Sequence, residues 1–448
     1  MSNSKAGALS GMTISIASEA GNFGSPDATD ARNIDTTTLA NATWYSVLAL
    51  RNGLAGIGKL KQMVYQPEVV TARGGRAAPS VVAVTESSGA VAKSIKGEFT
   101  LSFPLRWLGA TLPSASALGL LVGSALTYRN RTAGATVACT AVTATTFTVG
   151  GGDVASFKAG DMIMVPVAGK PRFSRVVYVD VGALTVYTMT QHGGTSSFTA
   201  RLCHVYYPAA TNTPSGNSFA VYVQDAAAKM DILATGVRIT SIDVTRTADA
   251  EPEIAFGCTC ADGYWTDGAS TALTAYSAPL PWGVAGTIEA KVRNAPVDIS
   301  SDFTTGSAPY EGTRSELPCR DWSFKAAIKM DARGGGQGKR SGIAEWDVVQ
   351  IDASANVTMD APSFGGYSPR RHLQLSEVRS LTIPIGGDLA DGSCGCMHIA
   401  QADVSEDPGR DISDERQSMS ASYRAGQYAG DSGASAQTNA PWCIALVA

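Results

Sequence analysis

The pattern closest to a known catalytic motif is a glycine-rich run at residues 334–341, which reads Gly-Gly-Gly-Gln-Gly-Lys-Arg-Ser. A phosphate-binding loop uses glycine amides and a lysine to hold phosphates, and it requires Gly-Lys followed directly by Ser or Thr, between a strand and a helix. Here Arg340 follows Lys339, and both flanks alternate as strands do. The sequence therefore favours a loop between two β-strands, and we expect no nucleotide and no other cofactor.

Two cysteine pairs could offer ligands to a metal: Cys258 with Cys260, and Cys394 with Cys396, the second pair followed by His398. Residues two apart on a strand share a face, so each pair could present two thiolates. Structural zinc sites usually leave two to four residues between their ligands, which neither pair does. Eight cysteines in 448 residues are also too few for a disulfide scaffold. Buried reduced thiols are the preferred interpretation and no metal site is predicted, although metal binding and a disulfide stay open as alternatives.

Four carboxylates gather around one predicted strand and turn: Asp243, Asp249, Glu251 and Glu253. A glycosidase needs two carboxylates that face each other across a cleft, which a sequence cannot show. The chain has only four histidines, no Gly-x-Ser-x-Gly and no His-Glu-x-x-His. We therefore predict no catalytic residue and no enzyme activity. The carboxylates form either a solvated turn or the lining of an acidic channel.

The composition is that of a β-protein. Gly, Ala, Ser, Thr and Val dominate, 44% of residues are hydrophobic and only 17% are charged. A surface so poor in charge favours burial against partner subunits. The net charge of −4 gives no basic surface for nucleic acid or anionic lipid. Without a secretory signal or an apolar run of about 20 residues, a soluble protein made in the cytoplasm is expected, with no membrane partner.

The chain divides into five predicted parts. Residues 1–41 form an N-terminal extended arm, and residues 134–203 form an inserted small β-domain of short strands. Residues 42–133 and 204–268 form a first β-domain, and residues 280–428 form a second. Residues 429–448 form a C-terminal arm ending in an apolar strand, which needs a partner edge on its own sheet or on another subunit.

Within the first domain, alternation predicts a strand over residues 97–105 and another over residues 236–246, and residues 108–126 predict one helix that packs on the sheet. Strict alternation would place Val237 and Ile239 on one face of the second strand. The other face, with Ile242 and Val244, would suit a contact between subunits. Similar strands at residues 322–330 and 346–351 suggest an internal duplication.

Three stretches together resemble the major tail tube protein of long, non-contractile-tailed bacteriophages. They are residues 86–101 with the Leu-rich helix up to Gly123, the run Phe157-Lys158-Ala159-Gly160-Asp161-Met162-Ile163, and the strand from Gly236 to Val244. About 60% of the chain is covered, by pattern rather than by an invariant motif. The chain is about twice the size usual in that family.

The resemblance implies a β-sandwich or barrel with one flanking helix, here duplicated and carrying the inserted barrel. Subunits would form homotrimeric or homohexameric rings that stack into a virion tail tube, assembled in the bacterial cytoplasm. Tape measure, tail terminator and distal tail proteins would be partners, and DNA would pass through the lumen without specific binding. Candidate contacts between rings are the loops with Arg73, Gly74, Gly75 and Arg76, and with Gly334, Gly335, Gly336 and Lys339. Asp243, Asp249, Glu251 and Glu253 are the candidate acidic lumen residues.

Two other readings stay open. One is a different virion component, such as a tail terminator or a capsid decoration protein. The other is a carbohydrate-binding surface β-protein, which would show exposed aromatic platforms.

Overall fold

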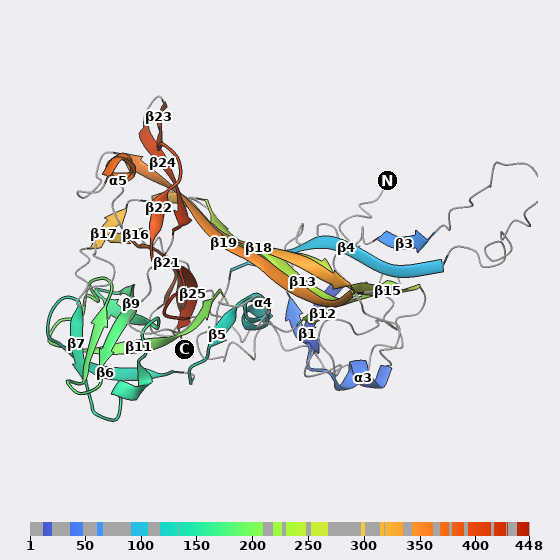
Figure 1. Cartoon of the computed structure of the whole chain (residues 1–448), viewed down its shortest axis with the longest axis horizontal. Helices are drawn as coiled ribbons and strands as arrows, with labels where there is room; N and C mark the ends of the chain where they lie inside the picture. The colour runs from blue at the N-terminus through green and yellow to red at the C-terminus, as the bar shows by residue number, and fades with distance from the viewer. Residues whose placement is uncertain are drawn as a thin grey trace, which may run out of the picture.

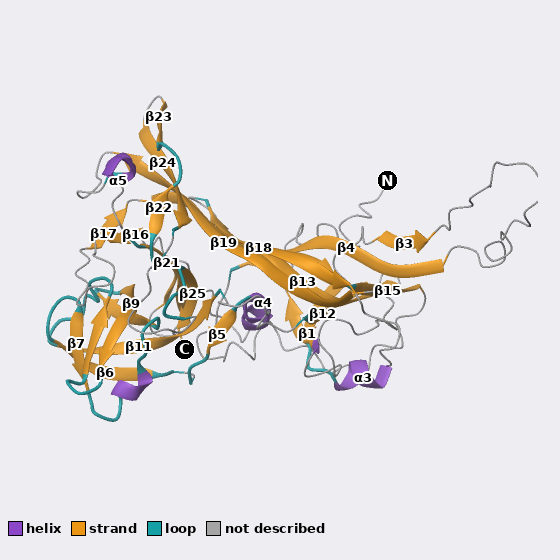
Figure 2. Cartoon of the chain, in the orientation of Figure 1, coloured by secondary structure: helices purple, strands orange, loops and turns teal. Residues whose placement is uncertain are grey.

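The structure is a computed structural model. It describes residues 12–19, 36–47, 61–65, 91–105, 117–132, 134–208, 218–225, 230–247, 252–267, 297–300, 314–317, 319–334, 343–361, 368–375, 379–388, 393–413, 416–426, 428 and 437–447. Within these ranges the chain is mainly β, as predicted, with antiparallel strands in two sheets and three short α-helices (Figures 1 and 2). The helices are α3 (Thr36–Asn41), α4 (Ala117–Ala125) and α5 (Pro369–Leu375).

The first sheet, called the large sheet below, runs in the order β2-β1-β12-β13-β18-β19-β24-β22, with further strands paired to β13, β4 and β24. Its strands are β1 (Met12–Ser18), β2 (Tyr45–Val47), β3 (Lys61–Tyr65), β4 (Val91–Pro104), β12 (Phe219–Asp225), β13 (Met230–Arg246), β14 (Glu253–Cys260), β15 (Asp262–Asp267), β18 (Cys319–Gly334), β19 (Ile343–Ala361), β22 (Ala402–Val404), β23 (Gly409–Ser413) and β24 (Arg416–Ala425).

The second sheet runs in the order β17-β16-β20-β21-β25-β11-β6-β7-β10-β9-β8, with β5 paired to β11. Its strands are β5 (Thr127–Arg129), β6 (Thr136–Ala141), β7 (Thr146–Val149), β8 (Met162–Val167), β9 (Lys170–Asp180), β10 (Thr185–Thr188), β11 (Ser197–Tyr207), β16 (Val297–Ser300), β17 (Arg314–Leu317), β20 (Leu381–Asp388), β21 (Ser393–Ile399) and β25 (Trp442–Val447).

A six-stranded barrel closes within the second sheet because β11 pairs with both β6 and β8. Its interior is a separate hydrophobic cluster that includes Phe147, Ile163, Val176 and Leu202, all from strands β6 to β11. Turn residues in the left-handed region, such as Gly160 (φ 89°) and Gly169 (φ 75°), permit its tight connections. The predicted small β-barrel is thus confirmed, and its core is built from residues that are close in sequence.

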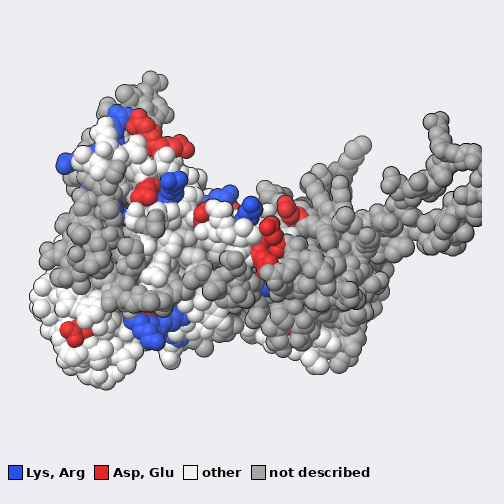
Figure 3. Space-filling model, viewed as in Figure 1, with Lys and Arg blue, Asp and Glu red and all other residues white. Residues whose placement is uncertain are grey.

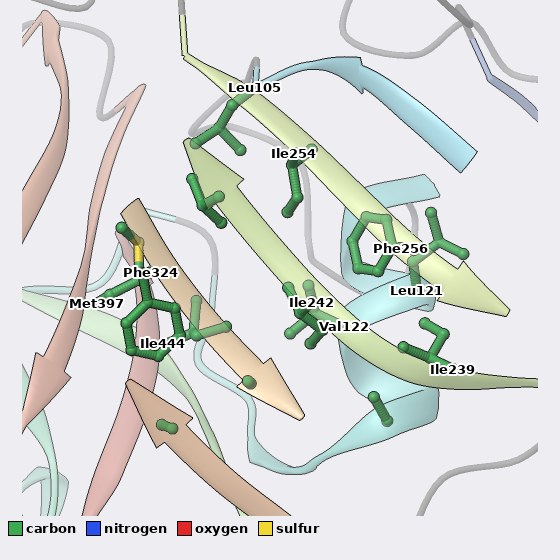
Figure 4. Packing of buried hydrophobic residues seen from close by; sticks show 14 of the residues in the cluster. Leu105, Leu121, Val122, Ile239, Ile242, Ile254, Phe256, Phe324, Met397 and Ile444 are labelled. Carbon is green, nitrogen blue, oxygen red and sulfur yellow. The ribbon is translucent and has the colours of Figure 1, made fainter. Parts of the chain in front are cut away.

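The large sheet is apolar on one face over its central strands. One row of directly opposed residues runs across five strands and is buried throughout: Leu101, Phe256, Ile242, Ala326 and Ala353. Helix α4 lies against this face, and Figure 4 shows Leu121 and Val122 of the helix beside Ile239, Ile242 and Phe256. The described part of the predicted helix therefore packs on the sheet as expected. Phe324, Met397 and Ile444 in the same core join the large sheet to the second sheet.

Strand β13 departs from strict alternation. Its register with β14 shifts between Ile239 and Ser241, which is a β-bulge. The extra residue resets the period, so Ile239 before the bulge and Ile242 and Val244 after it all reach the same core. The prediction that Ile242 and Val244 lie on a face that contacts other subunits is therefore wrong, because their face is covered within the chain.

Both chain ends are built into the sheets where they are described. Strand β1 lies between β12 and β2, and Ile14 and Ile16 are buried, so this part of the predicted extended arm is a strand of the large sheet. Strand β25 lies between β21 and β11. Of the two partners expected for the apolar C-terminal strand, the structure has the one within the same chain.

The two predicted β-domains meet in one sheet. Strand β13, from the first, pairs with β18, from the second, from Ser241 opposite Ala327 to Arg246 opposite Trp322. Strands β18 and β19 form a long hairpin that starts at Cys319 opposite Met359 and ends at Gly334 opposite Ile343.

Candidate interaction surface

The face of the large sheet opposite the buried face carries mostly polar side chains, and it is called the polar face below. A row of opposed residues crosses six strands, β4, β14, β13, β18, β19 and β24, and every member is partly or fully exposed: Ser102, Ala255, Asp243, Lys325, Ser354 and Arg424. The next row is also polar where its side chains are described: Glu253, Thr245, Ser323, Asn356 and Ser422. Because opposed residues share a face, these rows form one continuous surface.

Several residues of the polar face have small hydroxyl side chains. Thr358 and Ser420 share a hydrogen bond of 3.1 Å across β19 and β24, and Asn356 donates to Ser323 at 3.5 Å. At the bulge of β13, a Cβ on Gly257 would lie 2.7 Å from the Ser241 hydroxyl oxygen, so glycine is needed there. The two rows therefore contain no long apolar side chain among their described residues.

Charges of both signs are interspersed on this face. The Lys325 ammonium lies 3.6 Å from a carboxylate oxygen of Asp243, whose other oxygen accepts a 2.9 Å hydrogen bond from the Ser241 hydroxyl. Lys329, Asp352 and Glu253 are exposed nearby. Figure 3 shows both blue and red side chains in the region of β18 and β19. Such a surface exerts no strong net attraction on an anion.

Of the predicted acidic lumen residues, the structure brings Asp243 and Glu253 together on the polar face, in adjacent rows of β13 and β14. Asp249 and Glu251 lie outside the described residues. Asp243 is paired with Lys325, a partner that sequence reasoning missed because β13 and β18 were assigned to different domains.

Of the predicted contact loops, Arg73, Gly74, Gly75, Arg76, Gly335, Gly336 and Lys339 also lie outside the described residues. Gly334 is the last residue of β18, opposite Ile343 at the start of β19. The glycine-rich run thus joins two antiparallel strands, whereas a phosphate-binding loop joins a strand to a helix.

None of the eight cysteines forms a disulfide in the structure, and all but Cys319 are buried. Burial raises the pKa of Cys139 to about 11 and that of Cys203 well above its usual value. Cys258 and Cys260 share the inner face of β14, inside the core. Among the described residues, no group of three or more His, Cys, Asp and Glu side chains is placed to hold a metal.

The four histidines are buried, and the rings of His192, His204 and His398 each make a hydrogen bond. The Gly194 amide donates to Nδ1 of His192 at 3.0 Å, so its Nε2 carries the proton and donates to the Thr143 carbonyl at 3.0 Å. The Arg131 amide donates to Nδ1 of His204 at 3.0 Å. These contacts describe structural histidines.

Comparison with known proteins finds no matching family model and no curated protein of significant similarity. None of the described helices is long and apolar enough to cross a membrane.

Proposed function

We propose that this chain is the structural subunit of a phage tail tube, a virion protein whose copies form rings that stack into a conduit for DNA. The polar face carries the proposal. A wall beside moving DNA should offer no apolar patches and no net attraction to phosphates, since cationic side chains that neutralise phosphates bind DNA firmly. Small polar side chains with interspersed charges meet both requirements.

The architecture supports the same proposal. The inner face of these strands is covered by α4 and by residues of the second sheet, which leaves the polar face of each copy free to line a lumen. The barrel would then lie away from the lumen as an added outer domain. Six copies per ring, or three copies if the chain contains two tube-like units, would complete the wall.

Electron microscopy of the purified full chain, with sedimentation over a range of concentrations, tests the assembly. Rings or tubes are expected. A compact monomer at every concentration would contradict the proposal, and glycan binding by that monomer would favour a surface lectin. Isolated rings that never stack would favour a tail terminator.

Site-specific labelling tests which face lines the lumen. With Cys319 replaced by Ser in both variants, a biotin attached to the new thiol of Lys325→Cys should capture streptavidin in the monomer and fail to do so inside a tube. In the matched control Lys158→Cys, on the exposed surface of the barrel, capture should persist in both states. Equal capture at position 325 before and after assembly would place the polar face outside.

A further inference from the structure

Strand β25 joins two parts of the second sheet. It pairs with β21 on one side, with His398 opposite Cys443, and with β11 on the other, with Tyr206 opposite Ile444. In the strand order, β25 separates β17, β16, β20 and β21 from β11 and the barrel. Removing β25 would therefore split the described sheet into two parts.

Strand β11 connects the barrel to this junction. Its first half, from Ser197 to Leu202, pairs with β6 and β8 of the barrel. Its second half, from Cys203 to Tyr207, leaves the barrel and pairs with β25 and β5. The position of the barrel relative to the rest of the second sheet thus depends on whether β25 is in place.

The turn that precedes β25 is held by a buried arginine of the barrel. Arg175 on β9 is 1% exposed and donates hydrogen bonds to three backbone carbonyls, at 2.8 Å to Ala440 and at 3.1 Å to both Gln437 and Thr438. Its guanidinium also lies 4.9 Å from the ring centre of Tyr428. Burying a guanidinium is costly unless its N–H groups are hydrogen-bonded. The three carbonyls of the turn accept these hydrogen bonds and so offset the cost of burying Arg175.

A second barrel residue holds the same turn. Asp161 is fully buried. One of its carboxylate oxygens accepts hydrogen bonds of 2.8 Å from the side-chain Nε2 of Gln437 and from the Arg129 guanidinium. The neighbouring Gly160 (φ 89°) approaches so closely that a Cβ would lie 2.7 Å from the Gln437 carbonyl oxygen. The loop between η4 (Val154–Ser156) and β8 is therefore shaped to receive this turn.

The surface under β25 forms a cluster of its own. It joins barrel side chains to side chains of β11, β21 and β25, and it is rich in sulfur: Met162, Met164, Phe173, Cys203, Val205, Cys394, Cys396, Cys443, Ala445 and Val447. The barrel core is a separate cluster that contains Cys139. This sulfur-rich cluster, called the seam below, is therefore distinct from the core of the barrel.

We propose that residues 437–447 form a C-terminal latch that fixes the barrel to the body of the molecule. Arg175 and Asp161 of the barrel bind the turn, and β25 fills the gap between β11 and β21. When the latch opens, the barrel moves as a folded unit and the sulfur-rich seam meets solvent.

Thiol labelling of the full chain tests this proposal. The chain is pulsed with N-ethylmaleimide at pH 8, and each cysteine is followed by mass spectrometry. Arg175→Gln removes the charge that holds the turn and should raise the labelling rates of Cys203, Cys394, Cys396 and Cys443 by about tenfold or more. Cys139, in the barrel core, and Cys258, in the core of the large sheet, should keep their rates.

The matched control is Arg172→Gln on the same strand. The Arg172 side chain lies against Gly193, and this variant removes an arginine from β9 while keeping the hydrogen bonds from Arg175 to the turn, so no rate should change. If Arg175→Gln fails to fold, Tyr428→Leu is a milder way to open the latch. It keeps the three hydrogen bonds from Arg175 to the turn and removes the aromatic ring beside the guanidinium. Unchanged rates for the four seam thiols in the folded variants, or equal acceleration of Cys139 and Cys258, would overturn the proposal.

Discussion

Asp243 of β13 and Lys325 of β18 lie directly opposite each other on the polar face, with 3.6 Å between carboxylate oxygen and ammonium nitrogen. The pair joins two segments that are far apart in the sequence. Its side chains are 30% and 58% exposed, so solvent screens most of the attraction between them. The pair therefore shapes the charge of the surface more than it stabilises the sheet.

Opposite faces of β13 should respond very differently to substitution. We expect Asp243→Asn to lower the free energy of unfolding by less than about 1 kcal/mol, as for other exposed ion pairs. Ile242→Ala, one residue away and fully buried, should cost about 2–5 kcal/mol because it leaves a cavity. Urea titration of both variants measures the two values, and equal losses would contradict the assigned faces.

The bulge in β13 should make residue 257 intolerant of a side chain. In Gly257→Ala the new Cβ would lie 2.7 Å from the Ser241 hydroxyl oxygen and 3.1 Å from that of Thr240. We expect a loss of about 1–3 kcal/mol in unfolding free energy, as for other overpacked sites. Adding Ser241→Ala should recover part of the loss, and a double variant no more stable than the single one would contradict this geometry.

Stability should fall as the pH drops from about 6.5 to 4. Burial, and to a lesser degree the charge of Arg131, lower the pKa of His204 from 6.5 to about 4. Between these values the unfolded chain binds a proton that the folded chain does not, so protonation favours unfolding. Above pH 6.5 the imidazole is neutral in both states and this effect is absent.

Urea midpoints at pH 7, 5.5 and 4.5 would measure that dependence. His204→Gln keeps an acceptor for the Arg131 amide and removes the titration. The variant should lose less stability between pH 7 and pH 4.5 than the parent chain, and parallel curves would contradict the assignment to His204.

The thiols should stay reduced in air. Cys203 of β11 lies opposite Val447 of β25, and β25 lies between β11 and β21. Cys203 and Cys394 of β21 are therefore separated by a whole strand, or about 10 Å, which is too far for a disulfide. We expect all eight cysteines to react with a thiol reagent after denaturation. In the native chain Cys319, which is not fully buried, should react first. A native disulfide between Cys203 and Cys394 would disprove the strand register given above.

Local patterns in the sequence predicted the strands well. The alternation of Trp322, Phe324, Ala326 and Ile328 with polar residues gave both the strand and its buried face. The barrel was also predictable, because its strands are short, close in sequence and separated by turn residues. Such features depend only on neighbours along the chain.

Long-range pairing was not predictable. The register of β13 with β18, and thus the Asp243–Lys325 pair, joins residues with no common local signal. The bulge after Ile239 breaks the period of two on which the face assignment depended. Arg175 also gave no signal, because its partners are carbonyl groups, which every residue has.

One strand shared by two units has an evolutionary consequence. The barrel cannot be exchanged between proteins as a set of whole strands. The first half of β11, Ser197–Leu202, closes the barrel, while the second half, Cys203–Tyr207, pairs with β25 and β5 outside it. A recombination event that kept both the barrel and the rest of the sheet intact would have to join the two sequences inside β11. It would also have to keep the alternation of side chains between the two faces of that strand. Relatives that lack the barrel are therefore expected to keep the second half of this strand.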